Sequence, residues 1–481
     1  MTTLAQKIPR GSITLFFAQI FSTMAFAVFY SSLVLFAVQG LHLSAVRANS
    51  IIATFVAFNF ALHLIGGFLG GRLLSFRLLF VIGMILQAAG SILISTVNVH
   101  LLYIGMAVFL TGSGMNVPCM NCMLAQLFEP DDKRRETAFL WNYAGMNVGF
   151  FIGFTIAGIY QMSRSFHALF FMTSFSSVIA ALIMLIGWKQ LKDIKTQLTE
   201  ATVSHFSRGI TGLIAITALI VALCFILIHA GLSSEIVMGF GVFMAVVIAV
   251  IAFTRKIKAE RHHLFAYYIF AIASLTFFTL YQLCPMALTL FLERNVDRHL
   301  LGFNIPTEWF LNIDSVIVIV GCPLFAHFIH SLRKKGHNVS IPFLFSIGLL
   351  LIGIAIALVS VGIHFSNAKG LTNAGWIILS YTLLAIGEIS LSPIGYAVVG
   401  QLAPPKLRGV MMGTWLMLVG VAATLSKLFS NIALGKQQAI SPLISNATYS
   451  STFLHLGLAS IAVGIVLLLL KPLIARLMDS V

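Results

Sequence analysis

The chain has 481 residues, of which 59% are hydrophobic and only 9% are charged, and its mean hydropathy is +1.00. This composition is far more apolar than that of soluble globular proteins, and it predicts a polytopic membrane protein. The net charge of +15 would be compatible with nucleic-acid binding in a soluble chain, but the basic residues stand in short clusters between apolar runs. Such clusters set membrane topology, so we expect no nucleic-acid partner.

The apolar runs follow a plan of six, two and six. The first run follows Lys7 and Arg10 and is too long for the hydrophobic region of a signal peptide, so it is interpreted as an uncleaved span. Two runs beyond the sixth follow a charged connection, and six more complete the chain. We expect an all-α protein with 14 transmembrane helices, at about 11–38, 47–69, 77–96, 100–127, 136–160, 166–188, 210–229, 233–254, 263–292, 310–332, 340–362, 374–401, 406–432 and 450–472.

The same plan predicts three parts: a six-helix bundle at 1–188, a cytoplasmic linker with two extra transmembrane helices at 189–262, and a second six-helix bundle at 263–481. An even number of spans places both termini on one side of the membrane, where most of the 29 Lys and Arg residues also lie. The positive-inside rule makes that side the cytoplasm. Two six-helix bundles are typical of secondary transporters, so we expect a multi-pass transporter of the inner (plasma) membrane.

Glu388 is an acid near the middle of the apolar run 376–401. A charged side chain there costs at least a few kcal/mol, and intramembrane acids usually bind protons or ions. Ser392 and Pro393 follow Glu388 within two turns, and a proline inside a helix removes a backbone hydrogen bond. The pattern therefore predicts a proton-binding group at Glu388 and a gate at Ser392 and Pro393.

The segment 112–149 reads GSGMNVPCMNCMLAQLFEPDDKRRETAFLWNYAGMNVG. It resembles the proton-dependent oligopeptide transporter (POT) family of the major facilitator superfamily, which has a Gly-rich helix, a PDD-RR loop and an aromatic-rich helix at this place. The likeness continues in 66–76, 291–310 and 386–417. The resemblance implies a major facilitator fold with two extra helices, and proton-coupled symport of di- or tripeptides by alternating access.

The chain departs from the family pattern in its first half. Family members carry an E-x-x-E-R-F pattern in the first span, whose acids take part in proton coupling and whose Arg meets the substrate carboxylate. A fourth-span Lys and a seventh-span Glu belong to the same network. The losses are mutually consistent, because a buried charge becomes costly once its partner is gone. The residues at the altered positions are Gln19, Ser22, Thr23, Phe26, Ala27, Val117 and Gln282.

The other end of the family pocket is retained. Asn147, Glu388 and Trp415 match family residues that surround the substrate amino group, and an eighth-span Asn falls on Asp314. If Asp314 and Glu388 face each other, the pair would accept a proton or a cation; otherwise Asp314 is simply hydrated. The resemblance thus implies proton coupling through Glu388 and Asp314, and substrate binding by Asn147, Gln282, Asp314, Glu388, Trp415, Phe26 and Tyr30.

The leading interpretation is a proton-coupled transporter of peptides or peptide-like, amine-bearing solutes that works as a monomer. No Walker-type phosphate loop is present, so ATP is not the expected energy source. We find no nucleophile or metal cluster typical of an enzyme, and we expect no cofactor and no metal. The alternatives are a divergent uniporter or exporter of a non-peptide small molecule, and a non-transporting membrane sensor.

Overall fold

The computed structural model describes residues 9–129, 132, 134–194, 196–200, 205–300, 302–336, 339–404, 407–435 and 441–478. Within these ranges, 14 helices are long and apolar enough to cross a membrane. This confirms the all-α fold class and the predicted number of spans. Helices are the expected solution because a lipid-exposed segment must satisfy its backbone hydrogen bonds internally.

The chain divides into two compact units. Unit 1 contains Met1–Tyr30 and Phe58–Leu232, and unit 2 contains Ser31–Ala57 and Ser233–Val481. The part of the chain between Ser31 and Ala57 thus packs with the C-terminal segment. The division at 1–188, 189–262 and 263–481 stays a prediction.

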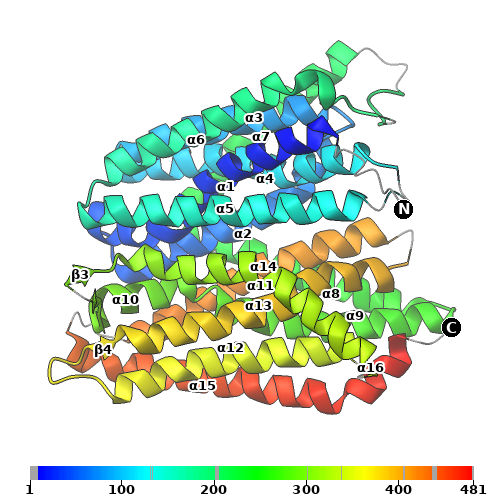
Figure 1. Cartoon of the computed structure of the whole chain (residues 1–481). Helices are drawn as coiled ribbons and strands as arrows, with labels where there is room; N and C mark the ends of the chain where they lie inside the picture. The colour runs from blue at the N-terminus through cyan, green and yellow to red at the C-terminus, as the bar shows by residue number, and fades with distance from the viewer. Residues whose placement is uncertain are drawn as a thin grey trace, which may run out of the picture. The chain divides into compact units, whose positions relative to one another are not determined.

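Unit 1 holds the N-terminal spans (Figure 1). Glycines allow close approach of neighbouring helices there: a Cβ on Gly83 of α3 would lie 2.8 Å from the carbonyl oxygen of Gly112 on α4. The elements that contribute to this unit are α1 (Arg10–Leu35), α2 (Ala45–Leu69), α3 (Phe76–Ser95), α4 (Val99–Gln126), α5 (Arg134–Met162), α6 (Phe166–Ile186), η2 (Trp188–Gln190) and α7 (His205–Ile228).

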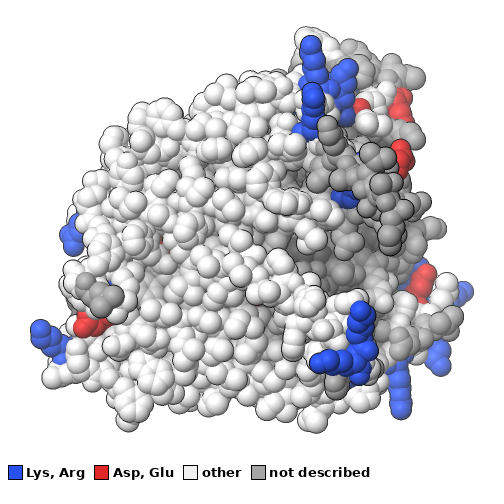
Figure 2. All heavy atoms as spheres, viewed as in Figure 1, with Lys and Arg blue, Asp and Glu red and all other residues white. Residues whose placement is uncertain are grey.

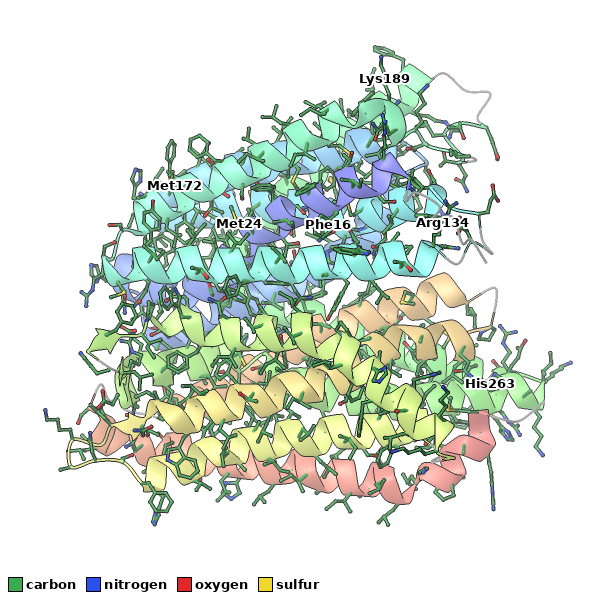
Figure 3. All side chains as sticks on the ribbon, viewed as in Figure 1. Phe16, Met24, Arg134, Met172, Lys189 and His263 are labelled. Carbon is green, nitrogen blue, oxygen red and sulfur yellow. The ribbon has the colours of Figure 1, made fainter. Side chains whose placement is uncertain are left out.

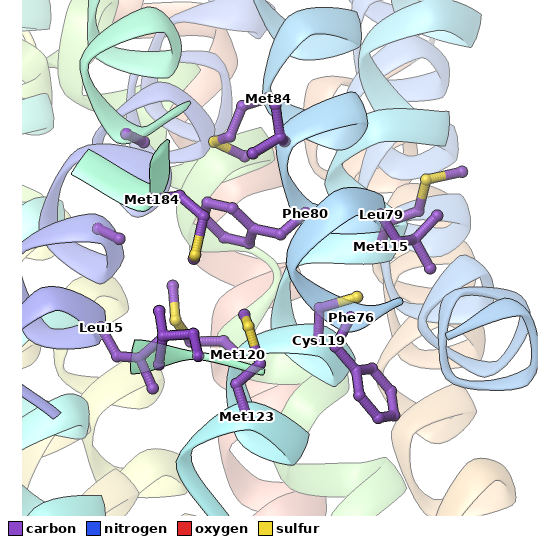
Figure 4. Packing of buried hydrophobic residues seen from close by; sticks show 14 of the residues in the cluster. Leu15, Phe76, Leu79, Phe80, Met84, Met115, Cys119, Met120, Met123 and Met184 are labelled. Carbon is purple, nitrogen blue, oxygen red and sulfur yellow. The ribbon is translucent and has the colours of Figure 1, made fainter. Parts of the chain in front are cut away.

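The core of unit 1 is rich in methionine. Figure 4 shows Met84, Met115, Met120, Met123 and Met184 together in one cluster of buried residues. Methionine is unbranched and flexible, so it fills the irregular spaces between helices that cross at different angles. Figure 3 labels Arg134 and Lys189 at one end of this unit, and Met172 toward the other. The unit is therefore apolar within and carries these charged groups at a helix end.

Unit 2 contains the second half of the chain, and a π-helical turn interrupts its span Lys258–Asn295 between α9 and α10. Its helical elements are η1 (Phe36–Gly40), α8 (Ala230–Thr254), α9 (Lys258–Tyr281), η3 (Cys284–Leu288), α10 (Thr289–Asn295), η4 (Thr307–Phe310), α11 (Leu311–Lys334), α12 (Ile341–His364), α13 (Ala374–Leu402), α14 (Arg408–Leu434), α15 (Pro442–Leu469) and α16 (Lys471–Met478).

Four short strands lie in unit 2, at the end away from the C-terminus (Figure 1). Strand β1 (Val296–Asp297) pairs in parallel with β4 (Thr372–Asn373), and β2 (His299–Leu300) pairs antiparallel with β3 (Phe303–Asn304). The sequence did not predict them, because a two-residue strand has no periodic pattern. They hold together the connections that enter α11 and α13.

Charged side chains avoid the flanks of the helices. In Figure 2 the visible Lys, Arg, Asp and Glu atoms gather where the helices end, and the surfaces between those ends carry almost none. Large apolar side chains such as Ile85, Phe175 and Leu458 are exposed on these flanks. Apolar surface of this extent on helices of spanning length is what contact with lipid requires. The chain is a multi-pass membrane protein.

Candidate functional site

The carboxyl groups of Asp314 and Glu388 lie together inside unit 2. Asp314 is in the first turn of α11, Glu388 is in the middle of α13, and these two helices pack against each other. The hydroxyl of Tyr281, at the end of α9, donates a hydrogen bond of 3.1 Å to Oδ2 of Asp314. The two carboxyl groups are also close enough to hydrogen-bond each other, and Glu388 interacts with the same hydroxyl.

Two carboxyl groups in this arrangement favour holding one proton between them. A hydrogen bond between two carboxyls requires that one of them is protonated, and two adjacent carboxylates repel each other. Asp314 Oδ1 and Glu388 Oε2 are buried and have no hydrogen-bond partner within the described part of the chain. The pair can therefore accept a further donor, such as the ammonium group of a solute.

Tyr281 reaches this pair because α9 ends there. Pro285 cannot donate a backbone hydrogen bond, and it lies inside the π-helical turn η3 that follows Gln282. The carbonyl of Cys284 accepts the backbone N–H of Thr289 and also the hydroxyl of Thr289, the latter at 2.6 Å. Gln282, predicted to bind substrate, is 3% exposed and caps α9 next to Tyr281. Tyr281 was not predicted from the sequence. The pattern that could have indicated it is Pro285, four residues further along the same transmembrane run.

Trp415 lies on α14 and packs against the second half of α13. It is 3% exposed, its ring lies 5.8 Å from Tyr267 and 6.5 Å from Phe345, and a Cβ on Gly395 would lie 2.7 Å from Cζ2 of its ring. The structure therefore places Trp415 in an aromatic core beside the segment after Pro393. Its role toward a substrate stays a prediction.

The predicted gate residues stand inside a continuous α13. Pro393 is within the helix, and the hydroxyl of Ser392 is buried without a hydrogen-bond partner in the described ranges. The hydroxyl of Ser390 donates to the carbonyl of Ile386 at 2.9 Å. A proline together with serines that bond to their own backbone weakens a helix locally. This local weakness is what a hinge needs, and the gating role stays a prediction.

In unit 1, the positions that differ from the family pattern form a neutral polar network. Gln19 Nε2 donates to Thr23 Oγ1 at 2.8 Å, and Asn142 Nδ2 donates to Gln19 Oε1 at 3.3 Å. Asn147 is also buried, and its Nδ2 donates to the carbonyl of Tyr143 at 3.1 Å. The amide of Gln19 and the hydroxyl of Thr23 thus occupy positions where the resemblance leads one to expect charged groups.

Phe26 and Tyr30 form an aromatic row with α5. Their rings are 5.8 Å apart; Phe26 lies 6.1 Å from Phe150, and Tyr30 lies 6.4 Å from Phe154. Glycine on α5 allows this contact, because a Cβ on Gly149 would lie 2.4 Å from the carbonyl oxygen of Ile20. Phe150 and Phe154 were not predicted as part of a site; their positions one and two helical turns after Asn147 were the available signal.

Two acids outside the spans, Asp132 and Asp193, bond to groups at the start of a helix. Hydrogen bonds from Arg134 hold the pKa of Asp132 below its usual range. Burial raises the pKa of Asp193, although the backbone N–H of Phe76 and the nearby Arg77 act in the opposite direction. Both oxygens of Asp193 lie 3.1 Å from the Phe76 N–H, which begins α3. Among the described residues, no group of three or more His, Cys, Asp or Glu side chains could hold a metal ion.

The described part of the chain has 14 helices of spanning length in a major facilitator-type fold with two extra helices. Solved structures share this fold: a peptide transporter POT in complex with sulfate aligns with a TM-score of 0.85 at 23% identity, covering 100% of this chain and 97% of that one. A POT family transporter in complex with 5-aminolevulinic acid aligns with a TM-score of 0.83 at 22% identity, covering 97% of each chain.

Sequence comparison gives the family. The model described as PTR2, POT family, matches residues 73–441. Dipeptide and tripeptide permease A of Cronobacter turicensis is 28% identical over 477 residues, which cover 98% of this chain and 94% of that protein. Dipeptide and tripeptide permease B of Salmonella typhimurium is 25% identical over 484 residues, which cover 100% of this chain and 98% of that protein. The chain belongs to the POT family.

Proposed function

We propose that this protein is a secondary active transporter that moves di- or tripeptides, or peptide-like solutes with an amine, together with protons by alternating access. The observation that carries the proposal is the buried Asp314 and Glu388 pair with the hydroxyl of Tyr281. A pair of this kind can hold a proton and exchange hydrogen-bond partners with an ammonium group. Family membership and the names of the relatives support a peptide as the solute.

The proposed solute recognition is asymmetric. Asp314 and Glu388 would bind the amine, and Asn147, Gln282, Trp415, Phe26 and Tyr30 are proposed to contact the rest of the solute. The first-span network of Gln19 and Thr23 carries no charge to balance a carboxylate. Because a desolvated anion without a partner is costly, a free carboxylate would be held weakly.

The proposed cycle needs only one proton-binding pair and one hinge. Glu388 and Asp314 carry the coupling proton, and Ser392 and Pro393 bend α13 to open the site. The protein would work as a monomer, as a transporter and not an enzyme. It would lie in a bacterial inner membrane with both termini in the cytoplasm, as the bacterial relatives and the distribution of Lys and Arg favour.

Uptake into proteoliposomes tests the function. A labelled dipeptide, its C-terminal amide and a simple primary amine are each offered with an imposed pH gradient, acidic outside. We expect accumulation above the external concentration for at least one of them, and collapse of accumulation when a protonophore is added.

The outcomes separate the alternatives. Equilibration without accumulation indicates a uniporter, and accumulation only with the gradient reversed indicates an exporter. Binding in a thermal-shift assay without any movement indicates a sensor. Each of these three results would contradict proton-coupled uptake.

A further inference from the structure

Glu308 is a buried acid that the proposed transport site does not use. It lies in η4, the short turn that leads directly into α11, and it is 1% exposed. Neither of its carboxyl oxygens has a hydrogen-bond partner among the residues that the structure describes. An ionised carboxylate buried in this way would lose its hydration, and this loss outweighs the stabilisation by its own backbone N–H and by Arg298.

Glu293, on α10, is an acid nearby with the opposite surroundings. Its Oε1 accepts a hydrogen bond of 2.9 Å from Gln39 Nε2, and its Oε2 accepts one of 2.7 Å from the hydroxyl of Thr307. Oε2 also forms an ion pair of 3.0 Å with Arg298. Three side chains thus donate to the carboxyl group of Glu293.

Arg298 bonds to groups other than Glu308 and forms no ion pair with it in the described part of the chain. Besides the ion pair with Glu293, its Nη1 donates to the carbonyl of Ile305 at 3.1 Å. The charged groups that act on Glu308 are Glu293 from α10 and Arg298 from the connection between β1 and β2. The first repels a negative charge on Glu308, and the second is neutralised by the first. The carboxyl group of Glu308 thus lacks the side-chain donors that surround the carboxyl group of Glu293.

We propose that Glu308 is a proton-binding site, separate from Asp314 and Glu388, that carries its proton while η4 is packed as in this structure. The proton leaves when water reaches the carboxyl group, which requires that η4 separates from α10. The site lies at the end of unit 2 where the four short strands gather, ahead of Asp314 on the same segment. It does not depend on which solute the protein carries.

Thermal unfolding of the purified protein in detergent tests the site. The folded chain holds a proton on Glu308 that the unfolded chain releases in the ordinary range of a glutamic acid. Stability therefore falls as the pH rises, by about tenfold per pH unit in the folding equilibrium while the folded group keeps its proton. Glu308→Gln removes this component, so the melting temperature of the variant should exceed that of the wild type increasingly from pH 5 to pH 8. An equal offset at both pH values would overturn the proposal.

Two further variants and an infrared spectrum distinguish a bound proton on Glu308 from a general effect of substitution on stability. Glu308→Leu should be at least as stable as the wild type at pH 8, and a marked loss there would show that the charge is needed. Glu293→Gln is the matched control, because it leaves Arg298 unpaired and should destabilise the protein at pH 5 and at pH 8 alike. The infrared difference spectrum at pH 7, wild type minus either Glu308 variant, should contain a protonated-carboxyl band, because any band from Asp314 and Glu388 is common to both proteins and cancels; absence of this difference band contradicts the assignment.

Discussion

The hydroxyl of Tyr281 donates a hydrogen bond of 3.1 Å to Oδ2 of Asp314, and so joins the end of α9 to the first turn of α11. The same hydroxyl interacts with Glu388 on α13. Three helices therefore meet at the carboxyl pair of Asp314 and Glu388. In the proposed cycle, a change in the protonation of the pair would alter the bonds between these helices and so link proton binding to helix movement.

Glu388→Gln should abolish accumulation driven by a pH gradient while solute exchange stays measurable. The amide keeps the shape of the side chain but cannot take up or release a proton. Counterflow of labelled solute at equal pH, measured beside gradient-driven uptake in the same proteoliposomes, separates the two activities. If the variant still concentrates solute under the gradient, Glu388 is not the coupling group.

Tyr281→Phe should weaken solute binding about tenfold. The hydrogen bond to a carboxyl group contributes about 1.5 to 3 kcal/mol, and the phenyl ring keeps the stacking with Phe277 at 6.1 Å. Competition binding against a labelled solute measures the change. Tyr160→Phe, a change on α5 in unit 1, is the control and should leave binding unaltered; equal effects of the two changes would argue against a role for the Tyr281 hydroxyl.

A dipeptide should bind less tightly than its C-terminal amide. In the proposed recognition, both compounds would offer the same amine to Asp314 and Glu388, whereas the free carboxylate would find no positive charge in the first-span network of Gln19 and Thr23. Competition at one pH measures the ratio on the wild type and on Asp314→Asn, which should bind both compounds more weakly. Clear preference for the free dipeptide would mean that other residues recognise the carboxylate.

Pro393→Ala should lower the maximal uptake rate by roughly threefold or more and change the half-saturation concentration little. A proline in a helix interior costs about 3 kcal/mol relative to alanine, so its removal stabilises the straight form of α13. Pro342→Ala, at the first turn of α12 where a proline removes no helix hydrogen bond, is the matched control. Unchanged rates in both variants would exclude a hinge at Pro393.

Asp193→Asn should raise stability slightly at pH 7 and not at acid pH. An acid whose pKa is raised in the folded state binds more protons there, so its contribution to stability falls as the pH rises from the ordinary Asp range to the raised value. The side-chain amide of the variant would keep an oxygen that accepts from the Phe76 N–H. Because Asp193 is only half-buried, the gain stays below about 1 kcal/mol. Melting curves at pH 4 and pH 7 measure it, and a loss at pH 7 would contradict this account.

The number of spans could be predicted from the sequence because the length and hydropathy of each apolar run identify it as a span, whatever it packs against. Glu388 stood out for a similar reason, since an acid in the middle of such a run is rare. Asp314 was recognised only through the family resemblance. Tyr281 was missed because tyrosine is common in spans, and its position depends on the turn η3, which the sequence marks only by Pro285.

Other features depend on contacts between distant parts of the chain. Glu308 stands in a stretch that reads as a polar connection, and its burial follows from packing of η4 against other elements of unit 2. The hydrogen bond from Gln39 to Glu293 joins residues that are 254 positions apart. Periodicity reports which face of a helix is apolar and not which helix will cover it.

The grouping of Ser31–Ala57 with unit 2 has a consequence for how the protein is made. This segment leaves the ribosome before Phe58, and the rest of its unit begins only at Ser233. At ordinary rates of translation it waits roughly 10 to 35 s for its partners. Asn49, whose side chain donates to Asn431, has no native partner during that interval. A C-terminal fragment that starts at Ser233 lacks this segment when it is expressed alone. We therefore expect the fragment to fold only when the N-terminal fragment, which carries Ser31–Ala57, is present in the same membrane.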